Sequence, residues 1–233
     1  MDLAQAPLVD KMLKGSSVSD AFVAWGKLRR SGEDVLTHPL IDHMLDVAAC
    51  FGAVANHGGI RRAMHCCAQR TLEDADIARL SVLVFLHDIG KANAGFQSRR
   101  WQAPERPPGD WPTSPYGHGP EGWAIVSRSV DGLSHDVLAG LPLAEMASWA
   151  EDKTLGLLQA SISHHGRPLG DEPSKQVAYV WEPVRSAQGT VLYDPAATIS
   201  TMGTVLRRAF PLAFSPCAQL LPNSPALDRK SVV

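Results

Sequence analysis

Residues 80–91, Leu80-Ser81-Val82-Leu83-Val84-Phe85-Leu86-His87-Asp88-Ile89-Gly90-Lys91, decide the fold of this chain. The run is apolar on nearly every side as far as Leu86, which is typical of a buried strand or a buried helix. Its length, and the helix-start signal of Thr71 followed by two acidic residues, favour a helix at the centre of the molecule. Gly90 then predicts a bend directly after a histidine and an aspartate.

This His-Asp pair predicts a metal site. An imidazole nitrogen and a carboxylate side by side suit a divalent metal that keeps other positions open for water and a phosphate oxygen. The nearby Lys91 offers positive charge for a phosphate or for the site itself. The sequence therefore predicts metal-dependent hydrolysis, with a phosphoester as the expected substrate.

The composition is that of a globular protein. The chain has 233 residues, 45% hydrophobic and 20% charged, so we expect one domain over residues 1–233 with a substantial core. A net charge of -2 gives no basic footprint, which argues against a passive DNA-binding protein. The four cysteines form no Cys-x-x-Cys pair and are interpreted as reduced thiols. With no apolar stretch long enough to span a bilayer, a cytoplasmic location is expected.

The periodicity predicts an all-α helical bundle with long loops. Helices are expected at 17–30, 39–54, 61–69, 71–86, 120–130, 143–150, 154–164 and 195–210. Residues 99–117 are rich in proline and aromatic side chains and are expected to form a long loop. A small β-hairpin is possible near residues 179–191. In the loop, basic and aromatic residues could either stack on a nucleic acid strand or simply anchor the loop; they are Arg99, Arg100, Trp101, Trp111 and Tyr116.

Histidines are numerous for a chain of this length, and several lie at helix ends or on apolar faces. The candidate ligands are His43, His87, Asp88, His118, His164 and His165. Each has an alternative interpretation: His43 as a core histidine, His118 as a loop residue, and the His164-His165 doublet as a favourable partner of a helix C-terminus. Six ligands exceed what one open site needs, whereas two metals bridged by Asp88 would use all of them.

The combination of these segments resembles a known family. His43 and His87-Asp88 resemble the HD phosphohydrolase superfamily. Within it, Leu86-His87-Asp88-Ile89-Gly90-Lys91, Gly117-His118-Gly119 and Ser163-His164-His165-Gly166 resemble the HD nuclease domain of the CRISPR-associated nuclease-helicase of type I systems. The resemblance covers about residues 36–168. It implies an HD-type helical fold that degrades single-stranded DNA, including the strand displaced when an RNA-guided surveillance complex opens its target. It also implies a helicase partner in cis or in trans.

The resemblance further implies roles for individual residues. One metal would be held by His43, His87 and Asp88, and a second by Asp88, His118, His164 and His165. Asp88 and Lys91 would be catalytic, with Lys91 near the scissile phosphate or bracing the carboxylate. The two divalent ions (Mn, Ni, Co, Fe or Mg) would act through attack by a metal-bound hydroxide.

One element of the family pattern is missing from the expected position. The pattern closes with an aspartate on a later helix, in an Ala-Asp-Trp-like setting. Asp110, Asp194 and Asp228 do not match that setting, so we expect the domain to stop short of the final helix. No Gly-x-x-x-x-Gly-Lys-Ser/Thr motif is present, and no helicase domain is expected within these residues.

Two alternatives to the nuclease therefore stay open. The first is an HD phosphohydrolase that acts on nucleotides or cyclic nucleotides. The second is a degenerate, non-catalytic HD module that binds a partner, a hypothesis prompted by the missing aspartate.

Overall fold

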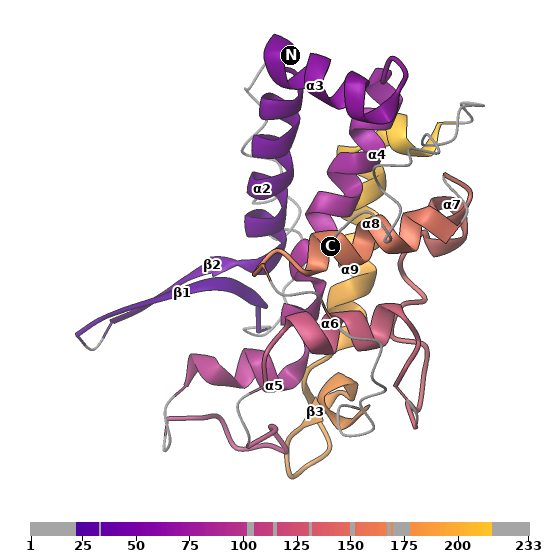
Figure 1. Ribbon diagram of the computed structural model, residues 1–233. Coiled ribbons are helices and arrows are strands. Elements are labelled where there is room, and N and C mark those ends of the chain that lie inside the picture. The colour runs from indigo at the N-terminus through magenta and orange to yellow at the C-terminus, as the bar shows by residue number, and fades with distance from the viewer. Residues whose placement is uncertain are drawn as a thin grey trace.

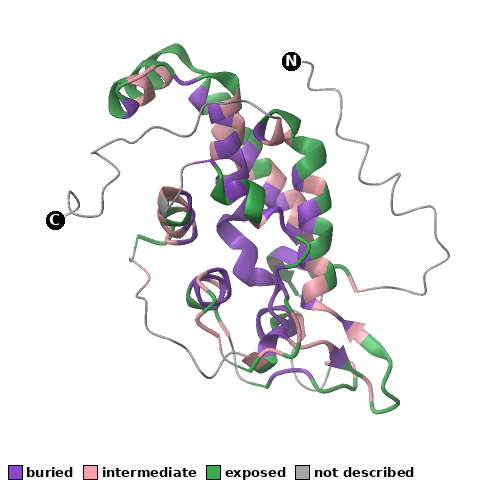
Figure 2. Cartoon of the chain, turned by 90° about the vertical axis from the view of Figure 1, so that its right-hand side faces the viewer, coloured by how far each residue is buried: buried purple, intermediate pink, exposed green. Residues whose placement is uncertain are grey.

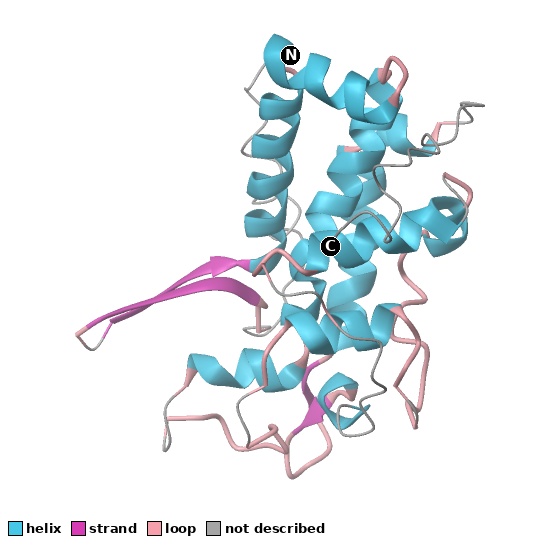
Figure 3. Cartoon of the chain, viewed as in Figure 1, coloured by secondary structure: helices cyan, strands magenta, loops and turns pink. Residues whose placement is uncertain are grey.

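The computed structural model describes residues 22–32, 34–101, 105–113, 116–130, 132–149, 152–166, 169 and 178–215. The α-helices are α2 (Leu40–Ala55), α3 (Gly58–Ala68), α4 (Asp74–Phe85), α5 (Ala94–Gln97), α6 (Gly119–Val126), α7 (Leu143–Ala147), α8 (Asp152–Ile162) and α9 (Pro195–Ala209). Short 3-10 segments are η1 (Leu86–Ala92), η2 (Ser98–Arg100), η3 (Ala178–Trp181) and η4 (Pro211–Phe214). The strands are β1 (Trp25–Ser31), β2 (Asp34–Pro39), β3 (Val184–Arg185) and β4 (Val191–Tyr193). This mostly helical architecture confirms the predicted all-α HD fold (Figure 3).

The predicted central helix is α4, and η1 continues it into the middle of the molecule. Every residue of η1 is buried, and Val82, Phe85 and Leu86 are fully enclosed in the main core. Figure 2 shows this segment as the buried axis around which the other elements pack. α2 packs along α4, while α6, α8 and α9 contact η1. The His-Asp pair is therefore surrounded by helices from distant parts of the sequence.

The helix predicted at 17–30 is wrong over the part that the structure describes. Residues 25–31 form strand β1, which pairs antiparallel with β2; residues 17–21 lie outside the described residues. The chain reverses at Gly32, whose φ of 61° lies in the left-handed region that glycine adopts without strain. Figure 1 shows the hairpin projecting from the body of the helices. Ala24 and Trp25 are buried through tertiary contacts while Val23 is exposed, so the apolar spacing at the start of this segment did not reflect a helical face.

The second hairpin is present and slightly displaced from its predicted position. β3 and β4 pair antiparallel after the 3-10 turn of η3. The described part of the predicted 99–117 loop contains no long helix or strand, but it is anchored. Trp111 is 5% exposed and packs against Phe22, Trp101 and Tyr193. Trp111 is thus a core residue here, which favours the anchoring interpretation for that side chain over stacking on a nucleic acid.

The buried amide of Gln97 fixes β1 to the centre of the fold. Its Oε1 accepts from the Trp25 backbone N–H at 2.9 Å, and its Nε2 donates to the Trp25 and Lys91 carbonyls at 3.1 and 2.6 Å. The Trp25 indole N–H donates in turn to the Gln97 carbonyl, and its ring stacks on Phe96. One side chain therefore satisfies three backbone groups of buried residues.

Replacing Gln97 with alanine should lower the free energy of unfolding by about 3 kcal/mol or more, because three buried backbone groups lose their partners. Urea unfolding followed by circular dichroism measures this. The exposed Gln188→Ala serves as the control and should unfold like the unmodified chain. Equal stability of the two variants would contradict this account of how β1 is held.

No described helix is long and apolar enough to cross a lipid bilayer.

Candidate metal centre

Asp88 lies at the centre of the site and is 1% exposed. Its backbone, with φ of −109° and ψ of 19°, departs from helical geometry in the middle of η1. The kink follows directly on the buried helix α4, so the carboxylate is held by a rigid element on its N-terminal side. The imidazoles that surround it come from α2, from η1 itself, from the start of α6 and from the end of α8.

The two carboxylate oxygens of Asp88 face different groups of side chains. Oδ2 lies 3.1 Å from His43 Nε2, 3.1 Å from His87 Nε2 and 2.6 Å from Lys91 Nζ. Oδ1 lies 3.2 Å from His118 Nε2 and 3.7 Å from His164 Nε2. His165 completes the second group, with its Nε2 2.9 Å from His118 Nε2. The structure thus brings all six candidate ligands into one cluster, with four imidazoles at the Asp88 carboxylate and His165 against His118.

Backbone contacts orient two of these imidazoles. His87 Nδ1 lies 2.9 Å from the Val84 carbonyl, and His164 Nδ1 lies 3.2 Å from the Ser161 carbonyl. A carbonyl can only accept, so Nδ1 carries the proton in each ring and a neutral ring presents the lone pair of Nε2. Both Nε2 atoms point at Asp88. Metal-binding histidines usually have this arrangement, in which one ring nitrogen donates to a carbonyl and the other is free to bind the metal.

Three histidines of the site, His43, His118 and His164, have pKa values lowered toward their neutral, ligand-competent form. Burial, with a smaller effect from Lys27, lowers the pKa of His43 to about 4. Burial also lowers the pKa of His118 to about 4 and reduces the pKa of His164, in both cases against the opposing charge of Asp88. At neutral pH these rings are therefore lone-pair donors.

The Asp88 carboxyl is ionised. Burial alone would raise its pKa, but the opposing effects of hydrogen bonding and positive charge, to both of which Lys91 contributes, hold the pKa well below its usual range. Lys91 is itself 5% exposed, and burial lowers its pKa although Asp88 acts in the opposite direction. Its ammonium also donates to the Gly26 carbonyl at 3.0 Å. Lys91 is thus wedged between β1 and Asp88.

These side chains fit divalent metals. The ligand atoms of His43, His87 and Asp88 lie within 4.8 Å of one another, as do those of His118, His164 and His165. Asp88 Oδ1 is buried without a hydrogen-bond donor, although imidazole nitrogens surround it. Lone pairs that converge on a buried carboxylate repel one another unless a proton or a cation lies between them. Imidazole with carboxylate suits transition metals better than calcium.

Two polar residues that position the site were missed from the sequence. Asn93 is fully buried and caps α5; its Nδ2 donates to the Gly90 carbonyl at 2.6 Å and to the Gly117 carbonyl at 3.0 Å. Glu121 accepts from the Gly117 backbone N–H at 3.0 Å. Both therefore fix the loop that carries His118. The available signal was a polar residue at position 93 inside a run of small buried residues.

A further carboxylate ligand is absent from both ligand groups over the described ranges. Asp110 accepts from the Arg185 backbone N–H, and Asp194 caps α9 by accepting from Ala196 N–H. Asp228 lies outside the described residues. The expectation that the closing aspartate lies elsewhere stays a prediction.

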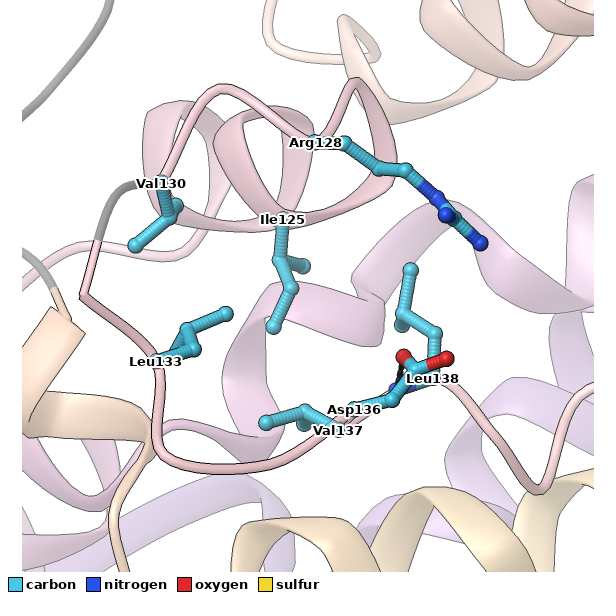
Figure 4. A pocket seen from close by; sticks show the side chains of 7 residues that line it. All are labelled: Ile125, Arg128, Val130, Leu133, Asp136, Val137 and Leu138. Atoms are coloured by element: carbon cyan, nitrogen blue, oxygen red, sulfur yellow. Dashed lines mark hydrogen bonds between the residues drawn. The ribbon is translucent and has the colours of Figure 1, made fainter.

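A small pocket lies beside the C-terminal end of α6, separate from the metal centre (Figure 4). Its volume is about 160 Å³, below the roughly 300–1,000 Å³ of typical small-molecule sites. Its lining is mostly apolar and includes none of the six candidate ligands; the lining residues are Ile125, Arg128, Val130, Leu133, Asp136, Val137 and Leu138. We assign it no role in the chemistry.

Comparison with solved structures supports the fold. A structure described as a CRISPR-associated protein matches with a TM-score of 0.54 and 19% identity, over 86% of this chain and 20% of that chain. T. fusca Cas3 bound to ATP matches with a TM-score of 0.52 and 17% identity, over 88% of this chain and 21% of that one. This chain therefore spans about a fifth of the length of these structures. No curated protein sequence matches it.

The family model described as "Cas3, HD domain" matches residues 25–225, which is most of the chain. The match includes the whole of η1 and every candidate ligand. The resemblance seen in the sequence is thereby confirmed, and the chain belongs to the Cas3 HD-domain family.

Proposed function

We propose that this chain is a metal-dependent nuclease that hydrolyses phosphodiester bonds of single-stranded DNA at a two-metal centre. The observation that carries the proposal is the division of Asp88 between two histidine groups, one facing Oδ2 and the other facing Oδ1. A carboxylate shared in this way is suited to bridge two cations. Two-metal sites of this kind act on both the attacking and the leaving oxygen of a phosphodiester.

The residues have distinct roles in this proposal. His43, His87 and Asp88 would hold one ion, and Asp88, His118, His164 and His165 the other. When bound, such ions supply Lewis acidity and an acidified water at neutral pH. Lys91 holds the carboxylate of Asp88 in place, because its ammonium lies between Asp88 and the Gly26 carbonyl and is buried. Contact between Lys91 and the substrate phosphate has less support from this geometry.

The substrate and partners follow from the family. A single-stranded DNA substrate, a surveillance complex and a helicase in cis or in trans are what membership of the Cas3 HD-domain family leads us to propose. The likeness to T. fusca Cas3-ATP, of which this chain spans about a fifth, is compatible with a helicase partner.

The direct test is incubation of the purified chain with circular single-stranded DNA and Mn²⁺, Ni²⁺, Co²⁺, Fe²⁺ or Mg²⁺ in turn. Cleavage that needs an ion and is stopped by EDTA is the expected result. Hydrolysis of mononucleotides or cyclic nucleotides with indifference to DNA would point to the nucleotide phosphohydrolase instead. Absence of cleavage with every ion, together with metal-free protein, would leave the non-catalytic binding module.

Replacing His118 with alanine should reduce the metal content of the chain from two ions to one, because this ring belongs only to the second ligand group. Elemental analysis after dialysis against the activating metal measures the stoichiometry. The change should also reduce DNA cleavage. An unchanged content of two ions would contradict the assignment of His118, and a content of one in the unmodified chain would contradict the two-metal centre.

A further inference from the structure

The β1–β2 hairpin begins at the metal centre. The Gly26 carbonyl, in β1, accepts a hydrogen bond from the Lys91 ammonium. A Cβ on Gly26 would lie 2.9 Å from His43 Cβ. The strand therefore runs outward from direct contact with two residues of the site. Figure 1 shows the hairpin extending away from the helices beyond this point.

The register separates the two faces of the hairpin. Lys27 lies opposite His38 and Arg29 opposite Leu36, and side chains directly opposite one another share a face of the sheet. On the other face, the Arg30 guanidinium donates hydrogen bonds to the carbonyls of Arg99 and Arg100, so this side chain turns toward η2. We call the face with Lys27, Arg29, Leu36 and His38 the outer face.

The outer face presents two cations to solvent. Lys27 and Arg29 are exposed, and neither forms an ion pair or a side-chain hydrogen bond within the ranges that the structure covers. His38 Nε2 lies 2.9 Å from Asp46 Oδ2, so the acidic side chain at the base of the hairpin is hydrogen-bonded to a ring of the outer face. Asp34 lies at the tip, opposite Ser31 and beyond Arg29. The positive charge is therefore concentrated between the metal centre and the tip.

Cations on two elements, β1 and η2, act electrostatically on the metal centre. Lys27 contributes to lowering the pKa of both His43 and Lys91, and Arg99 to lowering that of Lys91. Arg99 is exposed, and its guanidinium lies 5.1 Å from the centre of the Phe96 ring. The net charge of the chain is -2, so this local excess of cations is a feature of the surface beside the metal centre and not of the chain as a whole.

We propose that the outer face of the hairpin is a phosphate-binding track that guides a single nucleic acid strand into the metal centre, through Lys27 and Arg29. The proposal rests on the nuclease function proposed above. Alternate residues of a strand are about 6.6 Å apart, which suits successive phosphates of an extended single strand. Leu36, 61% exposed, adds an apolar surface on which a base can lie.

The test is the salt dependence of DNA binding by a Lys27→Gln/Arg29→Gln chain. Binding of a fluorescein-labelled oligothymidine is followed by anisotropy in EDTA at several KCl concentrations. The slope of log K against log[KCl] should become shallower by about 0.7 for each lost phosphate contact. The small ester bis(4-nitrophenyl) phosphate does not reach the hairpin. Its hydrolysis with Mn²⁺ should be unchanged at neutral pH, well above the pKa of His43 of about 4, where loss of the Lys27 charge leaves that ring neutral. Lys27→Arg/Arg29→Lys should keep the full slope.

The matched control is Arg62→Gln/Arg208→Gln, which removes two exposed charges from α3 and α9 and should leave the slope unaltered. A hairpin variant that binds DNA like this control would overturn the proposal and leave the outer face to a protein partner. Loss of small-ester hydrolysis in the hairpin variant would also overturn it, since the residues would then support the metal centre itself. If the unmodified chain hydrolyses neither substrate with any ion while the slopes differ as expected, the nuclease function fails and the track stands.

Discussion

An Asp88→Ala chain should lose DNA cleavage and both metal ions at once. The Asp88 carboxylate faces both histidine groups, since Oδ2 lies near His43 and His87 while Oδ1 lies near His118 and His164. Removal of its carboxylate takes a ligand from each ion and leaves imidazoles alone to bind them. The expected loss of cleavage rate is about 1,000-fold or more, at the upper end of what removal of one electrostatic group costs an enzyme.

Rates of cleavage of circular single-stranded DNA and metal content by elemental analysis measure the effect. The chain contains its own control, because His135-Asp136 is a second His-Asp pair. Asp136 accepts from the Leu138 backbone N–H and lies in neither ligand group. Asp136→Ala should therefore keep full activity and both ions. Retention of DNA cleavage by Asp88→Ala would contradict the proposed metal centre.

The same substitution should also weaken the fold, and a second variant separates the two effects. Without Asp88, the buried Lys91 ammonium loses its counter-ion, which costs about 3–5 kcal/mol for pairs of this kind. Asp88→Asn keeps an oxygen to accept from Lys91, so it should unfold at a higher urea concentration than Asp88→Ala. Both variants should be equally inactive, because asparagine does not supply the anionic bridge.

The clustering of the candidate ligands could be expected from the sequence because these residues lie at points where local patterns end. His87 and Asp88 follow the apolar run of α4, and His164 follows α8, so their places on the fold came from helix ends alone. His43 was placed by its position in the apolar stripe of α2. The resemblance to a family then supplied the grouping of these residues. The distances between their side chains could be known only from the structure.

The start of strand β1 could not be predicted because the contacts that hold its first residue come from a distant segment, although its partner strand β2 follows directly in the sequence. Trp25 is tied to Gln97 through three hydrogen bonds, and no local pattern encodes a contact across 72 positions. The Ser31-Gly32 turn signal was present, but the apolar spacing before it favoured a helix. Asn93 and Gln97 were missed for a related reason: a polar residue in a buried run is informative only when its backbone partners are known.

Replacing Gly90 with alanine should damage the fold and the metal centre together. A Cβ at this position would lie 1.7 Å from the His118 carbonyl oxygen and 2.8 Å from the Gly122 nitrogen. These two atoms form the first hydrogen bond of α6, at 2.9 Å. Room for the methyl group requires α6 to move away from η1, and His118 moves with it. We expect a loss of about 3 kcal/mol in the free energy of unfolding, at the upper end for an overpacked core.

Substitution of a second glycine should change the stability in the opposite direction, which tests the role given to close packing at Gly90. Gly156 lies within α8, and apart from its chain neighbours and the nearby backbone of that helix, no atom of the described residues lies within 4 Å of a Cβ built on it. Gly156→Ala should stabilise the chain by about 0.4–1 kcal/mol, because the unfolded state loses freedom and the helix gains a better former. Thermal unfolding compares the two variants, and Mn²⁺ binding by calorimetry should be weakened only in Gly90→Ala. If Gly90→Ala kept normal stability and metal binding, η1 and α6 would not be in the close contact that brings His118 to Asp88, since that contact leaves no room for a side chain at position 90.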